Sequence, residues 1–152
     1  MLLTFDIGNS DITIGLWDNT AWRNVWRVPS KPDQPELFYG IRVRDYFTET
    51  GLDIGQVDTV VLSSVVPALT EKIRNVIKSL FNLEPVLLGP AVFNKLPIKV
   101  LNPYEIGSDL VSNAVAAWHL YKRTCVVCDF GTALTFTTIS ESGEMLGVSI
   151  VP

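Results

Sequence analysis

Two short stretches of the chain combine an aspartate with a glycine in a pattern that suits phosphate binding. The first is Asp6-Ile7-Gly8-Asn9-Ser10 and the second is Asp129-Phe130-Gly131-Thr132-Ala133. Each stretch follows an apolar run and precedes a second β-prone run, so each predicts a strand, a tight turn and another strand. An aspartate that ends a buried strand beside a glycine can hold a metal-bound phosphate, because the N–H groups of the turn face the anion.

A single Asp-x-Gly match would be weak support for such a site, because these residues also occur in ordinary hairpin turns. Two matches, each between strand-like runs, indicate a duplicated structural unit. The sequence therefore predicts a phosphate site, with the analogy between folds as part of the argument.

A third aspartate, Asp109, stands at the start of a predicted helix that ends near Tyr121. Ser108 or Asp109 can cap this helix, and the helix dipole favours a carboxylate at this end. Asp109, Ser112 and Asn113 follow one another at i, i+3 and i+4, so they form a polar stripe. A carboxylate in this position can accept the proton of an attacking hydroxyl, or it can be merely a first-turn helix residue.

The two cysteines, Cys125 and Cys128, have the spacing of a redox pair or of half a zinc site. They lie in an apolar run that predicts a buried strand, in which residues three apart point to opposite faces. We therefore expect both cysteines to fill the core. The only histidine, His119, is expected at the surface or in the last turn of its helix rather than as a ligand.

Composition limits the class of protein. With 152 residues, 47% of them hydrophobic, the chain can build the core of one domain. The net charge is −4 and no basic block is present, which argues against nucleic acid or an anionic membrane as partner. The apolar runs are too short to span a bilayer and the N-terminus shows no signal peptide, so we expect a cytoplasmic protein.

The remaining patterns predict the α/β elements that position the three aspartates. Strands are expected at 2–7, 11–17, 21–28, 57–63, 85–88, 124–129, 132–139 and 144–151, and helices at 35–48, 68–81 and 108–121. Pro35 suits the first turn of its helix, Gly51 ends that helix, and residues 89–103 are expected to be mostly loop. The order is βββαβαβ, then a helix, then a second βββ set. Because three strands alone leave an apolar face uncovered, we expect a fragment, or a chain completed by another polypeptide.

With these residues in view, the sequence resembles type III pantothenate kinases, members of the actin, sugar-kinase and Hsp70 ATPase superfamily. Five matching segments occur in the family's order: Asp6–Ser10, Ser63–Pro67, Asn102–Asp109, Asn113–Ala117 and Asp129–Ala133. The resemblance implies a ribonuclease-H-like, duplicated actin-type fold, with βββαβαβα as its first half and the opening βββ of its second half. The expected ranges are 1–107 for the first half, 108–123 for a connecting helix and 124–152 for the incomplete second half.

The resemblance also implies ATP-dependent phosphorylation of pantothenate to 4'-phosphopantothenate, the first step of coenzyme A biosynthesis. The implied cofactors are ATP, Mg²⁺ and a monovalent cation, K⁺ or NH₄⁺. Family members are typically homodimers that bind pantothenate close to the dimer interface. The alternatives are a non-catalytic regulatory or binding member of the family, and a kinase for another small hydroxylated substrate.

The family's motifs imply a role for each matching residue. Asp109 is expected to be the general base, with Asp6 near the magnesium and Asp129 near the monovalent cation. The residues expected to bind the ATP phosphates are Asp6, Gly8, Asn9, Ser10, Gly131 and Thr132. Those expected at the substrate are Tyr104, Gly107, Ser108 and Asp109. Tyr104 and Glu105 either line the substrate pocket or only shape the loop.

Two segments depart from the family's pattern. The family usually has an arginine after the base aspartate, where it is expected to hold the substrate carboxylate, and this chain has Leu110. A leucine cannot donate a hydrogen bond. The second glycine motif usually continues Thr-Thr-Phe-Asp, and here it reads Leu134-Thr135-Phe136-Thr137. These changes affect the substrate contacts and the cation site, and they leave Asp6, Asp109 and Asp129 in place.

Overall fold

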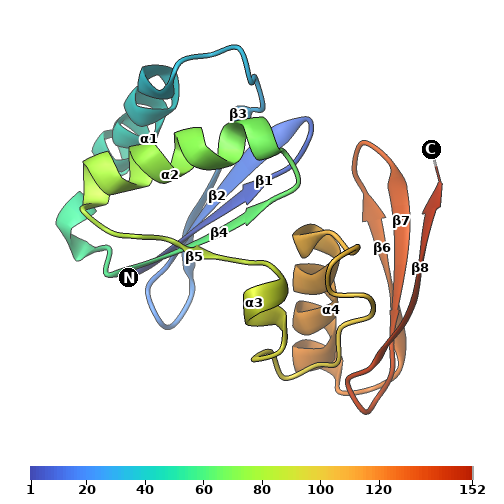
Figure 1. Ribbon diagram of the computed structural model, residues 1–152. Helices are drawn as coiled ribbons and strands as arrows, with labels where there is room; N and C mark the ends of the chain where they lie inside the picture. Colours follow the sequence, from blue (N-terminus) through green and yellow to red (C-terminus); the bar gives the residue numbers. More distant parts are fainter. Residues whose placement is uncertain (152) are drawn as a thin grey trace. The chain divides into compact units, whose positions relative to one another are not determined.

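A five-stranded sheet forms the centre of the first unit, which covers residues 1–87 (Figure 1). The computed structural model describes residues 1–151 of the chain. The strands are β1 (Leu2–Ile7), β2 (Asp11–Trp17), β3 (Trp22–Pro29), β4 (Thr59–Ser64) and β5 (Val86–Leu87). They lie in the order β3-β2-β1-β4-β5, with the first three antiparallel and with β4 and β5 parallel to β1. The predicted βββαβαβ order of the first unit is thus confirmed.

Two helices cover one face of this sheet. Helix α1 (Glu36–Thr50) begins directly after Pro35, so this proline precedes the helix instead of lying in its first turn as predicted. The helix ends at Gly51, as predicted, because a φ of 67° lies in the left-handed region that favours glycine. Helix α2 (Pro67–Phe81) starts with Pro67, whose missing N–H is no loss in a first turn. A 3-10 helix, η1 (Ile54–Gln56), precedes β4.

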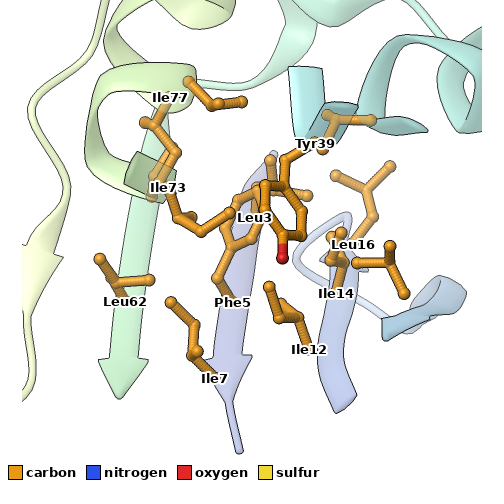
Figure 2. Packing of buried hydrophobic residues seen from close by; sticks show 14 of the residues in the cluster. Leu3, Phe5, Ile7, Ile12, Ile14, Leu16, Tyr39, Leu62, Ile73 and Ile77 are labelled. Atoms are coloured by element: carbon orange, nitrogen blue, oxygen red, sulfur yellow. The ribbon is translucent and has the colours of Figure 1, made fainter. Parts of the chain in front are cut away.

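Alternation along β1 decides which face of the sheet the helices cover. Leu3, Phe5 and Ile7 are buried in the cluster that joins the sheet to α1 and α2 (Figure 2). Thr4 and Asp6 lie on the opposite face, because successive strand residues alternate. Burial of an apolar side chain stabilises the fold by about 1.5–3 kcal/mol, so a shift by one residue would be strongly unfavourable. Packing of this core therefore places the Asp6 side chain on the face of the sheet that α1 and α2 do not cover.

The second unit begins at Leu88 and combines a three-stranded antiparallel sheet with one long helix (Figure 1). The sheet has the order β6 (Cys125–Phe130), β7 (Leu134–Ile139) and β8 (Met145–Val151). Helix α4 (Ser108–Tyr121) packs on one face, where Val111 and Ala114 share a buried cluster with Ile139 and Met145. The β7–β8 connection turns at Gly143, with a φ of 83° that suits glycine.

A short helix, α3 (Pro90–Phe93), lies in the segment 89–103 that the sequence predicts to be mostly loop. Pro90 presets the backbone of its first turn, and Phe93 is buried. Four residues are too few to produce a recognisable periodicity, so the sequence did not reveal α3. The other residues of this segment lie outside helices and named strands, and the prediction of mostly loop is confirmed. None of the helices described for residues 1–151 is long and apolar enough to cross a membrane.

Two local predictions for the second unit are wrong. Neither Ser108 nor Asp109 caps α4, because the chain enters the helix one residue earlier and Gly107 becomes the N-cap residue. Cys128 is exposed, since it lies on the face of β6 that α4 does not cover, whereas Cys125 is half-buried on the covered face. The cysteines do point to opposite faces, as predicted.

The contacts within the chain divide it between Leu87 and Leu88. The resemblance to the kinase family instead places the boundary between the two halves at 107/108. A division by contacts finds the parts of a chain that pack mainly against themselves. A division by duplication finds the two halves that share one fold. The ranges 1–107, 108–123 and 124–152 therefore stay a prediction.

Candidate functional site

The first Asp-Gly turn connects β1 to β2 in the first unit. Asp6 is an exposed residue near the carboxyl end of β1, and it lies beside Thr13 of β2 and Ser63 of the parallel strand β4. The Gly8 N–H donates to the Asp11 carbonyl oxygen over 3.0 Å, which closes the turn. A Cβ atom at Gly8 would lie only 3.2 Å from the same oxygen. The turn therefore needs glycine for space at this point.

Two neighbouring segments hold the backbone of this turn in place. The Ser30 hydroxyl donates to the Gly8 carbonyl over 2.6 Å, and the Ser30 N–H donates to the Ser10 carbonyl over 2.9 Å. The Val65 N–H, just after β4, donates to the Ile7 carbonyl over 3.0 Å. The turn is thus fixed from both sides, while the side chains of Asn9 and Ser10 are exposed.

The second Asp-Gly turn connects β6 to β7 in the second unit. Asp129 lies near the carboxyl end of β6, opposite Thr135 of β7, and its carboxylate is half-buried. The Gly131 N–H donates to the Ala133 carbonyl over 3.2 Å. The side chain of Asn113 on α4 reaches this turn, where its Nδ2 donates to Asp129 Oδ2 over 3.0 Å. The turn is therefore tied to the helix that covers its sheet.

Asp109 lies in the first turn of α4, where N–H groups have no partner within the helix. Its Oδ1 accepts a hydrogen bond from the N–H of Leu110 over 2.8 Å. Ser108 beside it is buried, and Asp109 itself is half-buried. Residues four apart share one face of a helix, so Asp109 lies one turn before Asn113, which bonds to Asp129. The structure thus brings Asp109 and Asp129 to the same end of the second unit.

A groove of about 320 Å³ lies at the N-terminal end of α4, with Gly107 and Leu110 in its lining. Most of its lining is apolar, and the only charged side chain among the residues that line it is a carboxylate. It is lined by Leu101, Asn102, Glu105, Ile106, Gly107, Leu110, Val148 and Ile150. Leu110 is only 7% exposed, so its side chain forms part of the groove wall.

The residues predicted to bind substrate differ in their positions. Gly107 lines the groove, whereas Tyr104 is 89% exposed and does not line it. Sequence reasoning left open whether Tyr104 and Glu105 line the substrate pocket or only shape the loop. Glu105 lines this groove, and the roles of both residues stay a prediction. Sequence reasoning also missed the bond between Asn113 and Asp129, although the polar stripe on α4 was a signal for it.

Each turn, taken by itself, offers a carboxylate that suits a divalent cation carrying phosphate. Asp6 and Asp129 are carboxylates at strand ends, and Mg²⁺ prefers oxygen ligands of this kind, usually one or two carboxylates with substrate phosphates. Within residues 1–151, the structure holds no cluster of three or more His, Cys, Asp or Glu side chains able to bind a metal ion. A magnesium ion at either turn would have one protein carboxylate, with phosphate oxygens and water as its other ligands.

Comparison with known proteins decides the family. The family model described as type III pantothenate kinase matches residues 2–152. This chain belongs to the type III pantothenate kinase family. The type III pantothenate kinase of Anaeromyxobacter sp. (strain K) is 41% identical over 152 residues, which are the whole of this chain and 60% of the relative. The chain thus spans about three fifths of the length of this curated family member.

Solved structures agree with the predicted fold class. The ethanolamine utilization protein EutJ from Carboxydothermus hydrogenoformans aligns with a TM-score of 0.54 at 15% identity, covering 99% of this chain and 51% of that protein. The ROK hexokinase from Thermus thermophilus aligns with a TM-score of 0.53 at 13% identity, covering 95% of this chain and 48% of that enzyme. At such identities the likeness concerns the fold alone. The predicted α/β, actin-type architecture of the pantothenate kinase family is confirmed.

Proposed function

We propose that the full-length protein transfers the terminal phosphoryl group of ATP to the primary hydroxyl of pantothenate. The observation that supports this proposal is the match to the pantothenate kinase family model over residues 2–152, which includes both Asp-Gly turns and Asp109. Because the chain spans only 60% of its relative, the activity belongs to the longer protein. Phosphoryl transfer requires mainly positioning and charge neutralisation, together with a group that orients or deprotonates the nucleophile.

Each candidate residue receives a role that suits its position. Asp109, in the first turn of α4, serves as the general base for the attacking hydroxyl. Asp6 and Asp129 hold the cations that neutralise the phosphate charge. The residues proposed to contact the ATP phosphates are Asp6, Gly8, Asn9, Ser10, Gly131 and Thr132. Those proposed to contact the substrate are Tyr104, Gly107, Ser108 and Asp109.

The proposal includes properties that the relatives' names do not state. We infer that the enzyme uses Mg²⁺ with ATP and requires a monovalent cation, K⁺ or NH₄⁺, near Asp129 and Thr132. We further propose a homodimer that works in the cytoplasm and binds its substrate close to the dimer interface. A sedimentation measurement of the full-length protein with and without pantothenate tests the dimer.

Leu110 favours a second candidate function, a kinase for another small hydroxylated substrate. Its side chain forms part of the groove wall, and among residues 1–151 the only charged residue that lines the groove is Glu105. Such a lining offers no cationic group to a substrate carboxylate, because a leucine cannot donate a hydrogen bond and a glutamate repels an anion. A substrate without a carboxylate would suit this groove better than pantothenate does.

The experiment is a coupled ADP-release assay on the full-length protein, with and without pantothenate, in potassium and in sodium buffer. We expect turnover that requires pantothenate and is faster in potassium. A folded dimer that binds ATP but shows no pantothenate-dependent turnover would contradict the proposal. Turnover with a different hydroxylated acceptor would then support the second candidate, and its absence would support a non-catalytic role.

A further inference from the structure

We propose that Asn113 is a positioning residue that holds the Asp129 carboxylate in a fixed orientation relative to helix α4. The inference rests on the proposed function, because it takes Asp129 as part of the phosphate and cation site. The observation that carries it is the bond from Asn113 Nδ2 to Asp129 Oδ2 over 3.0 Å, between two half-buried side chains sixteen residues apart in the chain.

The chemistry of the donor suits a cation site. A hydrogen bond to an ionised carboxylate is about twice as strong as one between neutral groups, so it restricts the rotation of the Asp129 side chain. The amide donor is neutral, and it therefore leaves the negative charge of Asp129 intact for a cation. A lysine or arginine at position 113 would instead neutralise this charge and compete with the cation. The bond uses Oδ2, which leaves Oδ1 to contact the cation.

The position of Asn113 also explains why such a bond matters. Asn113 lies one helical turn after Asp109 on the same face of α4. Through its bond to Asp129, the helix that carries the proposed base also fixes the carboxylate at the end of β6. Helix α4 thereby fixes the distance between the proposed base, Asp109, and the proposed cation ligand, Asp129. Catalytic groups need this kind of support, because small displacements of the reacting groups cost large factors in rate.

The first unit supplies a matched control of the same chemistry. Asn75 Nδ2 on α2 donates to Glu36 Oε1 on α1 over 2.8 Å, at an exposed site outside both Asp-Gly turns. Both bonds join an asparagine on a helix to a carboxylate on a neighbouring element. Removal of the Asn75 amide therefore reports the effect of losing a structural bond of this type.

The test measures ATP affinity by titration calorimetry in magnesium and potassium buffer without pantothenate, so that it does not depend on turnover. In the full-length protein, we expect Asn113→Ala to weaken ATP binding by about 10-fold or more, as is typical when a partner that orients a metal ligand is removed. Asn75→Ala should leave the ATP dissociation constant within about twofold of its wild-type value. The KM for ATP should rise with the dissociation constant, while the KM for pantothenate stays constant.

A double-mutant cycle separates positioning from general stability. If Asn113 acts through Asp129, then Asn113→Ala should have no further effect on ATP affinity in an Asp129→Ala protein. Additive losses would overturn the inference, as would an Asn113→Ala protein that melts earlier but binds ATP like the wild type. If Asn113→Ala does not fold, Asn113→Leu keeps the side-chain volume without the donor and carries the same expectations. A wild-type protein that binds no ATP would overturn the proposed function itself, whereas the other outcomes concern Asn113 alone.

Discussion

The two Asp-Gly turns share one sequence pattern but differ in which face of the sheet their helices cover. In the first unit, α1 and α2 pack on the face of Phe5 and Ile7, opposite the aspartate, and Asp6 is exposed. In the second unit, α4 packs on the face of the aspartate itself and donates a hydrogen bond to Asp129. The same motif therefore places Asp6 on the face away from its helices, and Asp129 on the face that α4 covers.

The residue between the aspartate and the glycine shows the same difference in which sheet face the helices cover. Ile7 is 0% exposed, whereas Phe130 at the equivalent position is 84% exposed. Strand alternation puts both residues on the face away from the aspartate, and within residues 1–151 helices cover this face only in the first unit. The motif therefore specifies the turn, while the surrounding elements decide how its aspartate is supported.

The largest expected effect is on kcat, and it comes from a substitution in α4, the helix that covers the face of Asp129. In the full-length protein, Asp109→Asn should lower kcat by about 100- to 10,000-fold, because the general base is lost. Asp45→Asn on α1, a helix that covers the opposite face, is the control and should leave kcat unchanged. Steady-state kinetics of both variants checks this. An Asp109→Asn enzyme with wild-type kcat would remove Asp109 from the mechanism.

The next prediction concerns Ile7 and Phe130. Ile7→Ala should lower the free energy of unfolding by about 2–5 kcal/mol, because it leaves a cavity under the helices. Phe130→Ala should change it by less than about 0.5 kcal/mol, since an exposed side chain gives up few contacts. Urea unfolding of residues 1–152 measures both values. Equal losses of unfolding free energy in the two variants would show that Ile7 and Phe130 are equally buried, which would contradict the difference between the two units.

The two glycines provide a smaller and sharper contrast. A Cβ at Gly8 would lie 3.2 Å from the Asp11 carbonyl oxygen, whereas one at Gly131 would meet Ala133 at an ordinary 3.6 Å. Gly8→Ala should therefore destabilise the protein by about 1 kcal/mol through overpacking. Gly131→Ala should be neutral or stabilising by less than about 1 kcal/mol, because it restricts the unfolded chain. Thermal unfolding of the two variants decides, and a reversed order would be contrary to the turn geometry.

The smallest effect belongs to a purely structural aspartate in the β2–β3 turn. The hydroxyl of Thr20, followed by the backbone N–H groups of Ala21 and Thr20, lowers the pKa of Asp18 well below its ordinary value. A carboxylate whose pKa is lowered on folding contributes stability above its unfolded pKa of about 3.9, and this is lost as the pH falls towards the folded value. The stability difference between wild type and Asp18→Asn should therefore shrink between pH 6 and pH 2. Urea unfolding at several pH values measures it, and a constant difference would argue against the turn bonds.

Strands and long helices could be predicted from the sequence to within a few residues. Alternation in Leu3, Phe5 and Ile7 and the helical spacing in α2 each reflect one buried face, which a local pattern records. Helix α3 has only four residues and leaves no such record. The exposure of Cys128 depends on what covers the outer face of β6, which the strand's own residues do not specify.

The candidate site could be predicted only in part, for the same reason. Asp6, Asp109 and Asp129 were recognisable because each stands in a local motif of strand, turn or helix start. The bond from Asn113 to Asp129 and the part of Leu110 in a groove wall depend on contacts between distant segments. Such contacts arise from tertiary packing, which a single sequence does not display.

Identification of the reaction product decides whether the full-length protein phosphorylates pantothenate. The full-length protein is incubated with ATP, magnesium, potassium and pantothenate, and the products are analysed by mass spectrometry and phosphorus NMR. We expect 4'-phosphopantothenate, phosphorylated on the primary hydroxyl, to form in equal amount to ADP. Unchanged pantothenate beside a folded protein that binds ATP would contradict the proposed phosphorylation of pantothenate.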